Sequence, residues 1–391
     1  MPLSGRLPWV GIVWERTLEH QTITMLRLSI LALAAVLLSF TASATTWTVS
    51  NNPNKPAQYT SLQTAIDSAA IGDTLLISGS PTSYGTISLN KQLHLIGEGI
   101  GPSVDNPMCG TFYLQNQDAT SNASGSTLEG LRIGYLYMGY YGNVSVEDMT
   151  IERCRIDILY FQYNGASSVA KNIHLDQCHI YNYSYFDYDL WYDDNPAGDG
   201  MQEIVFENCV FDGISGAHFQ FVGDCNGELE LRNCMFLSTS QGLTSGNQAM
   251  SEAVFENCLF FGTQFSDNIT NCLFNNCLAY QGDDTLPPGD EAANNTGSNN
   301  LSATDPLFVS YNATPANHSW DHDYTLQEGS PAIGAGVNGV DIGIGGGSIS
   351  SFDGNLPHTP RGPVVTSINL PVTAVAVGGT LQINVSAESR D

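Results

Sequence analysis

The chain has 391 residues, with 39 Asp and Glu against 12 Lys and Arg, which gives a formal net charge of −27. Such an acidic surface repels nucleic acid and anionic lipid, so we expect neither as a partner. Charged residues make up 13% of the chain and hydrophobic residues 42%, a balance that argues against a disordered protein.

Residues 1–44 are predicted to be an upstream segment followed by a secretory signal peptide. A basic start at Arg27 precedes an apolar run over residues 28–40, and Ala42 and Ala44 mark a small-residue cleavage site. The run is too short to cross a bilayer, and no second long apolar stretch follows. We therefore expect a secreted protein, extracellular or at the cell surface, with no transmembrane segment.

The next elements predict the start of a repetitive β structure. Ser61 is a favourable N-cap for a short helix that ends at Gly72 and carries Leu62, Ala65 and Ile66 on its apolar side. Strands are expected over 74–77, 85–89 and 93–96. A helix in this place covers the open end of a solenoid and hides its core and strand edges, as repeat proteins require.

The centre of the chain repeats one pattern. In six segments a cysteine is preceded by apolar residues five and three positions earlier and followed by another two positions later, as in "IVFENCVFDGI" at 204–214. The six cysteines are Cys154, Cys178, Cys209, Cys234, Cys258 and Cys277. Apolar residues alternate as in a strand, except for a step of three just before the cysteine, where we expect a bend. Asn directly precedes four of these cysteines, and Asn tolerates left-handed backbone angles.

The repeat predicts the fold. A strand–bend–strand unit that recurs every 19 to 31 residues cannot bury its apolar face alone, so neighbouring coils must stack. We predict an all-β right-handed parallel β-helix over 45–355, with an N-terminal cap helix and about eight to ten coils. Residues 356–391, with alternating strands around Gly378 and Gly379, are predicted to form a short β tail. A leucine-rich-repeat horseshoe would need a Leu-x-x-Leu-x-Leu pattern that the chain lacks.

The repeated cysteines are expected to form a buried column of unbridged thiols. In-register residues on neighbouring coils lie about 4.8 Å apart, but their side chains are parallel, so a disulfide would be strained. Export to an oxidising compartment favours the alternative of disulfides. A zinc site is not indicated, because the same position is Leu131 in a further coil.

Stretches near both ends resemble one group of proteins. "YTSLQTAIDSAAIGDTLLISG" is similar to the N-terminal capping segment of secreted bacterial right-handed parallel β-helix proteins, the pectate-lyase-like superfamily. "DYTLQEGSPAIGAG" and "DIGIGGG" resemble the closing coils of the same group. The resemblance implies the β-helix and export. It implies no particular activity, since this fold carries lyases, hydrolases and adhesins alike.

The interval between Cys178 and Cys209 is the longest, and extra residues in a solenoid form a loop on one face, commonly the binding face. Its aromatic residues are candidates to stack on sugar rings: Tyr183, Tyr185, Tyr188, Trp191 and Tyr192. Its carboxylates are candidates to share a Ca²⁺, the one cofactor that the sequence suggests: Asp187, Asp189, Asp193 and Asp194. The tyrosine-rich stretches 135–142 and 159–165 should stack on the same face, either as a sugar groove or as a packed wall.

No residue pattern establishes catalysis. Asp283 and Asp284 form an acidic pair of the kind that inverting glycoside hydrolases use, but they border a loop rich in Pro and Gly. Arg153 is the best-placed candidate base for a lyase and is expected to point outward. His179 is expected on the polar surface, and Tyr324 is expected to pack the last coil.

We predict a secreted or cell-surface protein that engages extracellular polysaccharide. One alternative is an enzyme, either a polysaccharide lyase or a glycoside hydrolase, that acts in the same groove. The other is a structural or adhesive surface protein.

Overall fold

The computed structural model describes residues 44–346 except 103–104, 116–120, 139–144, 162–169, 186–200, 213–216, 221–222, 239–241, 245–248, 267, 290 and 312–317, and also residues 364–369 and 384–388. The contacts group residues 45–391 into one unit, to which all that follows refers. The predicted signal peptide lies outside the described residues and stays a prediction.

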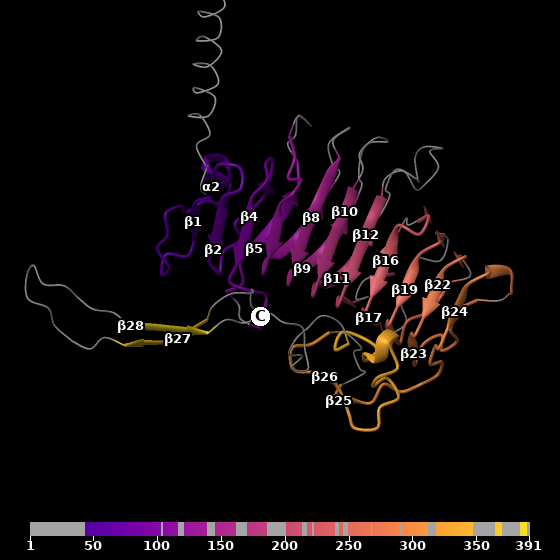
Figure 1. The fold of residues 1–391 in the computed structure, drawn as a ribbon. Coiled ribbons are helices and arrows are strands. Elements are labelled where there is room, and N and C mark those ends of the chain that lie inside the picture. Colours follow the sequence, from indigo (N-terminus) through magenta and orange to yellow (C-terminus); the bar gives the residue numbers. More distant parts are fainter. Residues whose placement is uncertain are drawn as a thin grey trace, which may run out of the picture. The chain divides into compact units, whose positions relative to one another are not determined.

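Two long parallel sheets run along the molecule, and the chain alternates between them (Figure 1). Sheet A has eleven strands in the order β1 (Thr46–Val49), β2 (Thr74–Ile77), β4 (His94–Gly97), β6 (Thr127–Glu129), β8 (Val146–Glu152), β10 (Ala170–Asp176), β12 (Met201–Glu207), β16 (Leu229–Arg232), β19 (Val254–Glu256), β22 (Leu273–Asn275) and β24 (Thr296–Ser298). Sheet B follows the order β3 (Ile87–Ser88), β5 (Met108–Tyr113), β7 (Arg132–Tyr137), β9 (Arg155–Tyr160), β11 (His179–Tyr185), β13 (Val210–Asp212), β17 (Met235–Leu237), β20 (Leu259–Phe261) and β23 (Leu278–Tyr280), with β14 (Phe219–Gln220) also paired to β11.

Shorter elements complete the unit. A third parallel sheet contains β15 (Gly223–Asp224), β18 (Met250–Ser251) and β21 (Ile269–Thr270). The helices are α2 (Leu62–Ser68) and the 3₁₀ turns η2 (Glu291–Ala293) and η3 (Val337–Gly339). Two antiparallel pairs join β25 (Phe308–Ser310) to β26 (Asp323–Leu326) and β27 (Val364–Asn369) to β28 (Asn384–Glu388). In-register pairing of parallel strands one coil apart is a parallel β-helix, so the fold that the repeat predicts is confirmed.

The bend between the sheets lies just before the repeated cysteine, where the step of three between apolar residues predicts it. The residue before each repeated cysteine has a positive φ, between 50° and 56° at Asn208, Asn233, Asn257 and Asn276. Arg153 and Gln177 hold the same conformation at the corresponding positions. A left-handed residue turns the chain from sheet A into sheet B, and Asn adopts it at low cost.

The core is one apolar column inside the coils. The repeated cysteines and the apolar residues around them are fully buried and belong to a single cluster. Phenylalanines stack from coil to coil inside it, with ring centres 4.7 Å apart between Phe211 and Phe236 and 4.9 Å apart between Phe236 and Phe260. Burying each such ring contributes about 1.5–3 kcal/mol, but only when the next coil covers it.

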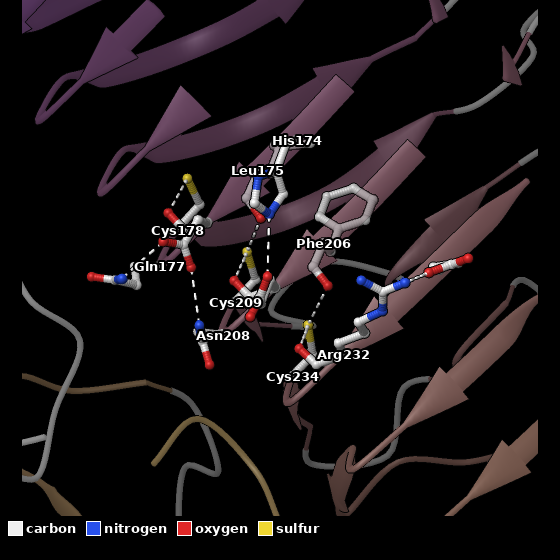
Figure 2. Close-up of polar contacts among 12 residues, drawn as sticks. His174, Leu175, Gln177, Cys178, Phe206, Asn208, Cys209, Arg232 and Cys234 are labelled. Atoms are coloured by element: carbon white, nitrogen blue, oxygen red, sulfur yellow. Dashed lines mark hydrogen bonds and ion pairs between the residues drawn. The ribbon is translucent and has the colours of Figure 1, made fainter. Parts of the chain in front are cut away.

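The repeated thiols hydrogen-bond as well as pack. No disulfide joins the nine cysteines, all of which are described and buried, as predicted. The position of the repeated cysteine in each coil is here called the slot. Each repeated thiol donates to a carbonyl of the preceding coil, and this carbonyl belongs to the residue three positions before the slot of that coil. Figure 2 shows this contact from Cys209 to Leu175 and from Cys234 to Phe206, at 3.4 Å in both cases.

The sulfur also accepts a hydrogen bond from the preceding coil. The backbone N–H of Leu131 donates to Cys154 Sγ at 3.4 Å. In a later coil an amide makes the same two contacts: Asn300 Oδ1 accepts the Cys277 N–H at 2.9 Å, and Asn300 Nδ2 donates to the Phe274 carbonyl at 2.8 Å. A cysteine or an asparagine at this position thus links two coils through a donor and an acceptor, whereas Leu131 fills the same position by packing alone.

Helix α2 forms where it is predicted but ends before Gly72. Ser61 Oγ accepts from the Thr64 N–H at 3.3 Å, and the predicted apolar side packs into the core. The expected end at Gly72 is wrong because the Asp73 carboxylate draws the Ala70 N–H to itself at 2.9 Å. The helix contacts the first strands (Figure 1), and its role as a cap stays a prediction.

Residues 305–311 and 318–346, here called the closing segment, lie on the outer face of sheet B. They build a second apolar cluster with Val210, Met235, Leu259 and Leu278, which point outward from four successive coils. Tyr324, at 2% exposure, packs there as predicted. No helix of the described residues is both long and apolar enough to cross a membrane.

Candidate functional site

The predicted aromatic and acidic loop is described only at its first residues. Tyr183 and Tyr185 belong to β11. The other predicted residues lie outside the described part of the chain: Tyr188, Trp191, Tyr192, Asp187, Asp189, Asp193 and Asp194. Their contact with sugar and with Ca²⁺ therefore stays a prediction. Within the described residues, no group of three or more His, Cys, Asp or Glu is arranged to hold a metal ion.

Four tyrosines from consecutive coils form a ladder on the outer face of sheet B. The ring centres are 5.1 Å apart between Tyr113 and Tyr137, 4.5 Å between Tyr137 and Tyr160, and 4.7 Å between Tyr160 and Tyr185. The rings are nearly parallel, with interplanar angles of 19°, 5° and 8°. The predicted stacking of the stretches around 135–142 and 159–165 is thus confirmed for Tyr137 and Tyr160.

The ladder follows from strand register. The four tyrosines are direct partners in β5, β7, β9 and β11, and parallel strands lie about 4.8 Å apart, close to the stacking distance of aromatic rings. Each inner ring is covered on both faces by its neighbours, and Tyr160 is only 8% exposed. The inner rings of Tyr137 and Tyr160 therefore present no open ring face.

A second aromatic row lies two residues before the ladder. Tyr135 is 43% exposed and lies parallel to Tyr137, with ring centres 6.4 Å apart. Tyr183 meets Tyr185 edge-on at 4.8 Å and shares the register of Tyr135. We call the ladder and this row together the aromatic face: Tyr113, Tyr135, Tyr137, Tyr160, Tyr183 and Tyr185.

Two arginines border the aromatic face. Arg132 and Arg155 are register partners at the start of β7 and β9, and both contact Asp157, at 3.9 Å and 3.0 Å. The Arg155 guanidinium also lies 3.9 Å from the centre of the Tyr181 ring. Paired with Asp157 and stacked on Tyr181 in this way, the Arg155 guanidinium is held in place.

The outer face of sheet A carries the opposite charge. One row of register partners runs Glu129, Glu152, Asp176, Glu207, Arg232 and Glu256. Carboxylates side by side on neighbouring strands repel each other and any anionic ligand. The arginines next to the tyrosines therefore make sheet B the more favourable of the two faces for an anionic ligand.

The arginine row continues into a buried polar junction beneath the closing segment. His179, the register partner of Arg155, places Nε2 3.1 Å from Asp212 Oδ2, and the two side chains are 2% and 0% exposed. The backbone N–H of His318 donates to Asp212 Oδ1 at 3.0 Å. The centre of the His318 ring lies 4.4 Å from the centre of the His179 ring.

The electrostatics of the junction follow from burial. Burial raises the pKa of Asp212 to about 7, although the His318 N–H partly stabilises the carboxylate. Burial, followed by repulsion from Arg155 and Arg132, lowers the pKa of His179 well below its usual value. The expectation that His179 lies on the polar surface is therefore wrong. Its cover comes from a segment more than a hundred residues later, and nothing near His179 in the sequence signals that.

The candidate catalytic residues have structural roles. Asp283 and Asp284 accept the N–H groups of Phe265, at 2.8 Å, and Gly282, at 3.0 Å, and so shape their loop. Arg153 does not point into solvent as expected. It is a bend residue, 8% exposed, and its Nε donates to Gln177 Oε1 at 3.0 Å. Neither feature adds a reactive group to the aromatic face.

The chain matches no family model and no curated protein. Among solved structures, a rhamnogalacturonan lyase is 13% identical over 69% of this chain and 92% of its own, with a TM-score of 0.38. A pectate lyase is 12% identical over 78% and 97%, with a TM-score of 0.42. An alginate lyase from a Paenibacillus species is 12% identical over 66% and 95%, with a TM-score of 0.29. The parallel β-helix is established by the strand pairing of this chain itself.

Proposed function

We propose that this protein is exported and binds an extracellular polysaccharide on the aromatic face of sheet B. The observation that carries the proposal is the tyrosine ladder, flanked by the exposed ring of Tyr135 and by the arginines Arg132 and Arg155. The aromatic, hydroxyl and guanidinium groups lie on one sheet face, and together they suit a surface rich in sugar hydroxyls.

The rings are held in place before any ligand arrives. Each ladder tyrosine is fixed by its strand and by its stacked neighbours, so binding costs little conformational entropy. A tyrosine edge offers apolar surface, and its hydroxyl can donate to and accept from a sugar hydroxyl. Because the ladder covers its own ring faces, a sugar ring can stack only on the exposed row, where Tyr135 is the most open.

The exposure of Tyr135 favours binding over the alternative of a packed wall. Rings that serve only to cover the solenoid would be buried, as Phe211 and Phe236 are inside it. Tyr135 is 43% exposed on the same sheet as Arg132 and Arg155, and aromatic rings that gather on one sheet face support a binding surface. The acidic loop residues Asp187, Asp189, Asp193 and Asp194 remain candidates for a Ca²⁺ that bridges the protein to an acidic sugar.

The test is a panel of insoluble and soluble polysaccharides, neutral and uronic-acid-containing, incubated with the protein in calcium or in chelator. We expect retention on at least one glycan, with every chain returned intact by mass spectrometry. Shortened chains would establish the enzymatic alternative instead, with unsaturated ends for a lyase and hydrated ends for a hydrolase. Retention on no glycan would contradict the proposal and leave the structural alternative.

A further inference from the structure

One buried carboxylate joins the closing segment to two coils of the solenoid. Asp212 lies on β13, its Oδ2 contacts His179 Nε2 on β11, and its Oδ1 accepts the His318 N–H from the closing segment. At 0% and 2% exposure, the carboxyl and the imidazole have no water to replace these contacts.

The geometry constrains how many protons the pair holds. Without a titratable proton, the neutral imidazole would donate its Nε2–H to the carboxylate across 3.1 Å, and the pair would carry a buried negative charge. With two, the imidazolium and the carboxylic acid would leave an unbalanced buried charge, which costs several kcal/mol. One proton makes a single hydrogen bond and leaves the pair neutral overall. Arg155 and Arg132 act against the second proton, since both disfavour a charged imidazole.

We propose that Asp212 and His179 share one proton and form a latch that keeps the closing segment docked without dependence on pH in the mildly acidic range. The undocked chain also carries one proton there, on His179 alone. Docking then moves a proton from the imidazole into the shared bond and neither takes one up nor releases one. The inference is independent of sugar binding.

Each residue of the latch, taken alone, would make docking of the closing segment depend on pH, and the two dependences have opposite directions. An isolated buried His179 has a lowered pKa, so docking would weaken as pH falls below the ordinary value of 6.5. An isolated buried Asp212 has its pKa raised from 3.8 to about 7, so docking would weaken as pH rises through that interval. Between about pH 4 and 6.5 the two effects oppose each other and cancel in the pair.

The other groups at the junction do not reproduce this balance. The closing segment contributes His318, His322, Tyr311 and Tyr324, and Arg155 and Arg132 face the pair from β9 and β7. Burial raises the pKa of both tyrosines further above neutrality, so they do not titrate there. Since His318 and His322 are present in every variant below, the comparison between variants isolates the pair.

The experiment measures hydrogen exchange of peptides from 318–345 between pH 5 and 7.5, corrected for the chemical exchange rate, in the wild type, Asp212→Asn, His179→Gln and the double variant. In D212N we expect docking to weaken toward acid by up to about tenfold per pH unit. In H179Q we expect it to weaken toward alkali with a similar slope. Between pH 5 and 6.5, the wild type and the double variant should follow the same shallower profile.

The two single variants are each measurable where they are predicted to be docked, D212N near pH 7.5 and H179Q near pH 5. If one variant does not fold even there, the slope of the other still tests the proposal. Slopes of the same sign in both variants, or slopes equal to that of the wild type, would overturn it. Peptides from β8 and β10, which do not contact the closing segment, provide the internal control.

Discussion

The slot cysteine makes two coil-to-coil contacts with one atom. Its Sγ donates to a carbonyl of the preceding coil and accepts the N–H of that coil's slot residue, as Cys209 does with Leu175 and Cys178. Burial raises the pKa of Cys154 and Cys178 and raises that of Cys109 to about 12, so these three thiols stay protonated at neutral pH. A thiol in this state is a structural group and not a nucleophile.

Substitutions at Cys209 distinguish hydrogen bonding from packing. Cys209→Val keeps an apolar side chain of similar size but leaves a buried N–H and C=O without a partner, which costs about 1–3 kcal/mol. Cys209→Ser keeps a donor and an acceptor. We expect the urea midpoint to fall further for C209V than for C209S. The opposite order would show that the cysteine column is only apolar packing.

The left-handed bend residue makes a separate prediction at Asn233, where φ is 51°. Asn233→Ala should cost about 1–2 kcal/mol, because a Cβ without a polar group is disfavoured in this conformation. Asn233→Gly, the matched control, should cost clearly less, because glycine adopts this φ freely. Both are measured as free energies of unfolding in urea, and equal losses would contradict the strain argument.

At the scale of elements, the sequence predicts the features that repeat from coil to coil. Alternation and the step of three predict sheets A and B and the bend, because each strand must bury the same side of every coil. The tyrosine ladder follows from register for the same reason. The junction of His179 with Asp212 is not periodic. It depends on where the closing segment folds back onto the outward-facing residues Val210, Met235 and Leu259, and only the structure shows that packing.

The ladder behaves as one element, so its central ring tests it. Tyr160→Leu keeps apolar volume but breaks stacking on both sides, each worth about 0.5–1.5 kcal/mol. We expect a loss of about 1–3 kcal/mol in the free energy of unfolding. Tyr160→Phe preserves both ring contacts and should recover most of that loss. If the Phe and Leu variants were equally unstable, stacking would not be the source of the stability.

At the scale of the molecule, the solenoid divides its outer surface by charge and by cover. Sheet A presents a row of carboxylates, whereas sheet B presents tyrosines and arginines on its earlier coils and lies under the closing segment on its later ones. The exposed aromatic surface on sheet B is thus bounded by the closing segment, and the His179 and Asp212 pair lies at that boundary. Sugar binding is proposed for the uncovered part alone.

The most direct test of this account is the affinity of Tyr135→Ala for the glycan that retains the wild type. Removing an exposed aromatic ring from the centre of a binding face should weaken binding about tenfold or more and leave stability nearly unchanged. Leu76→Ala, which removes a 40% exposed apolar side chain from sheet A, is the matched control and should bind like the wild type. Wild-type affinity in Y135A, or an equal loss in both variants, would contradict the placement of the sugar on the aromatic face.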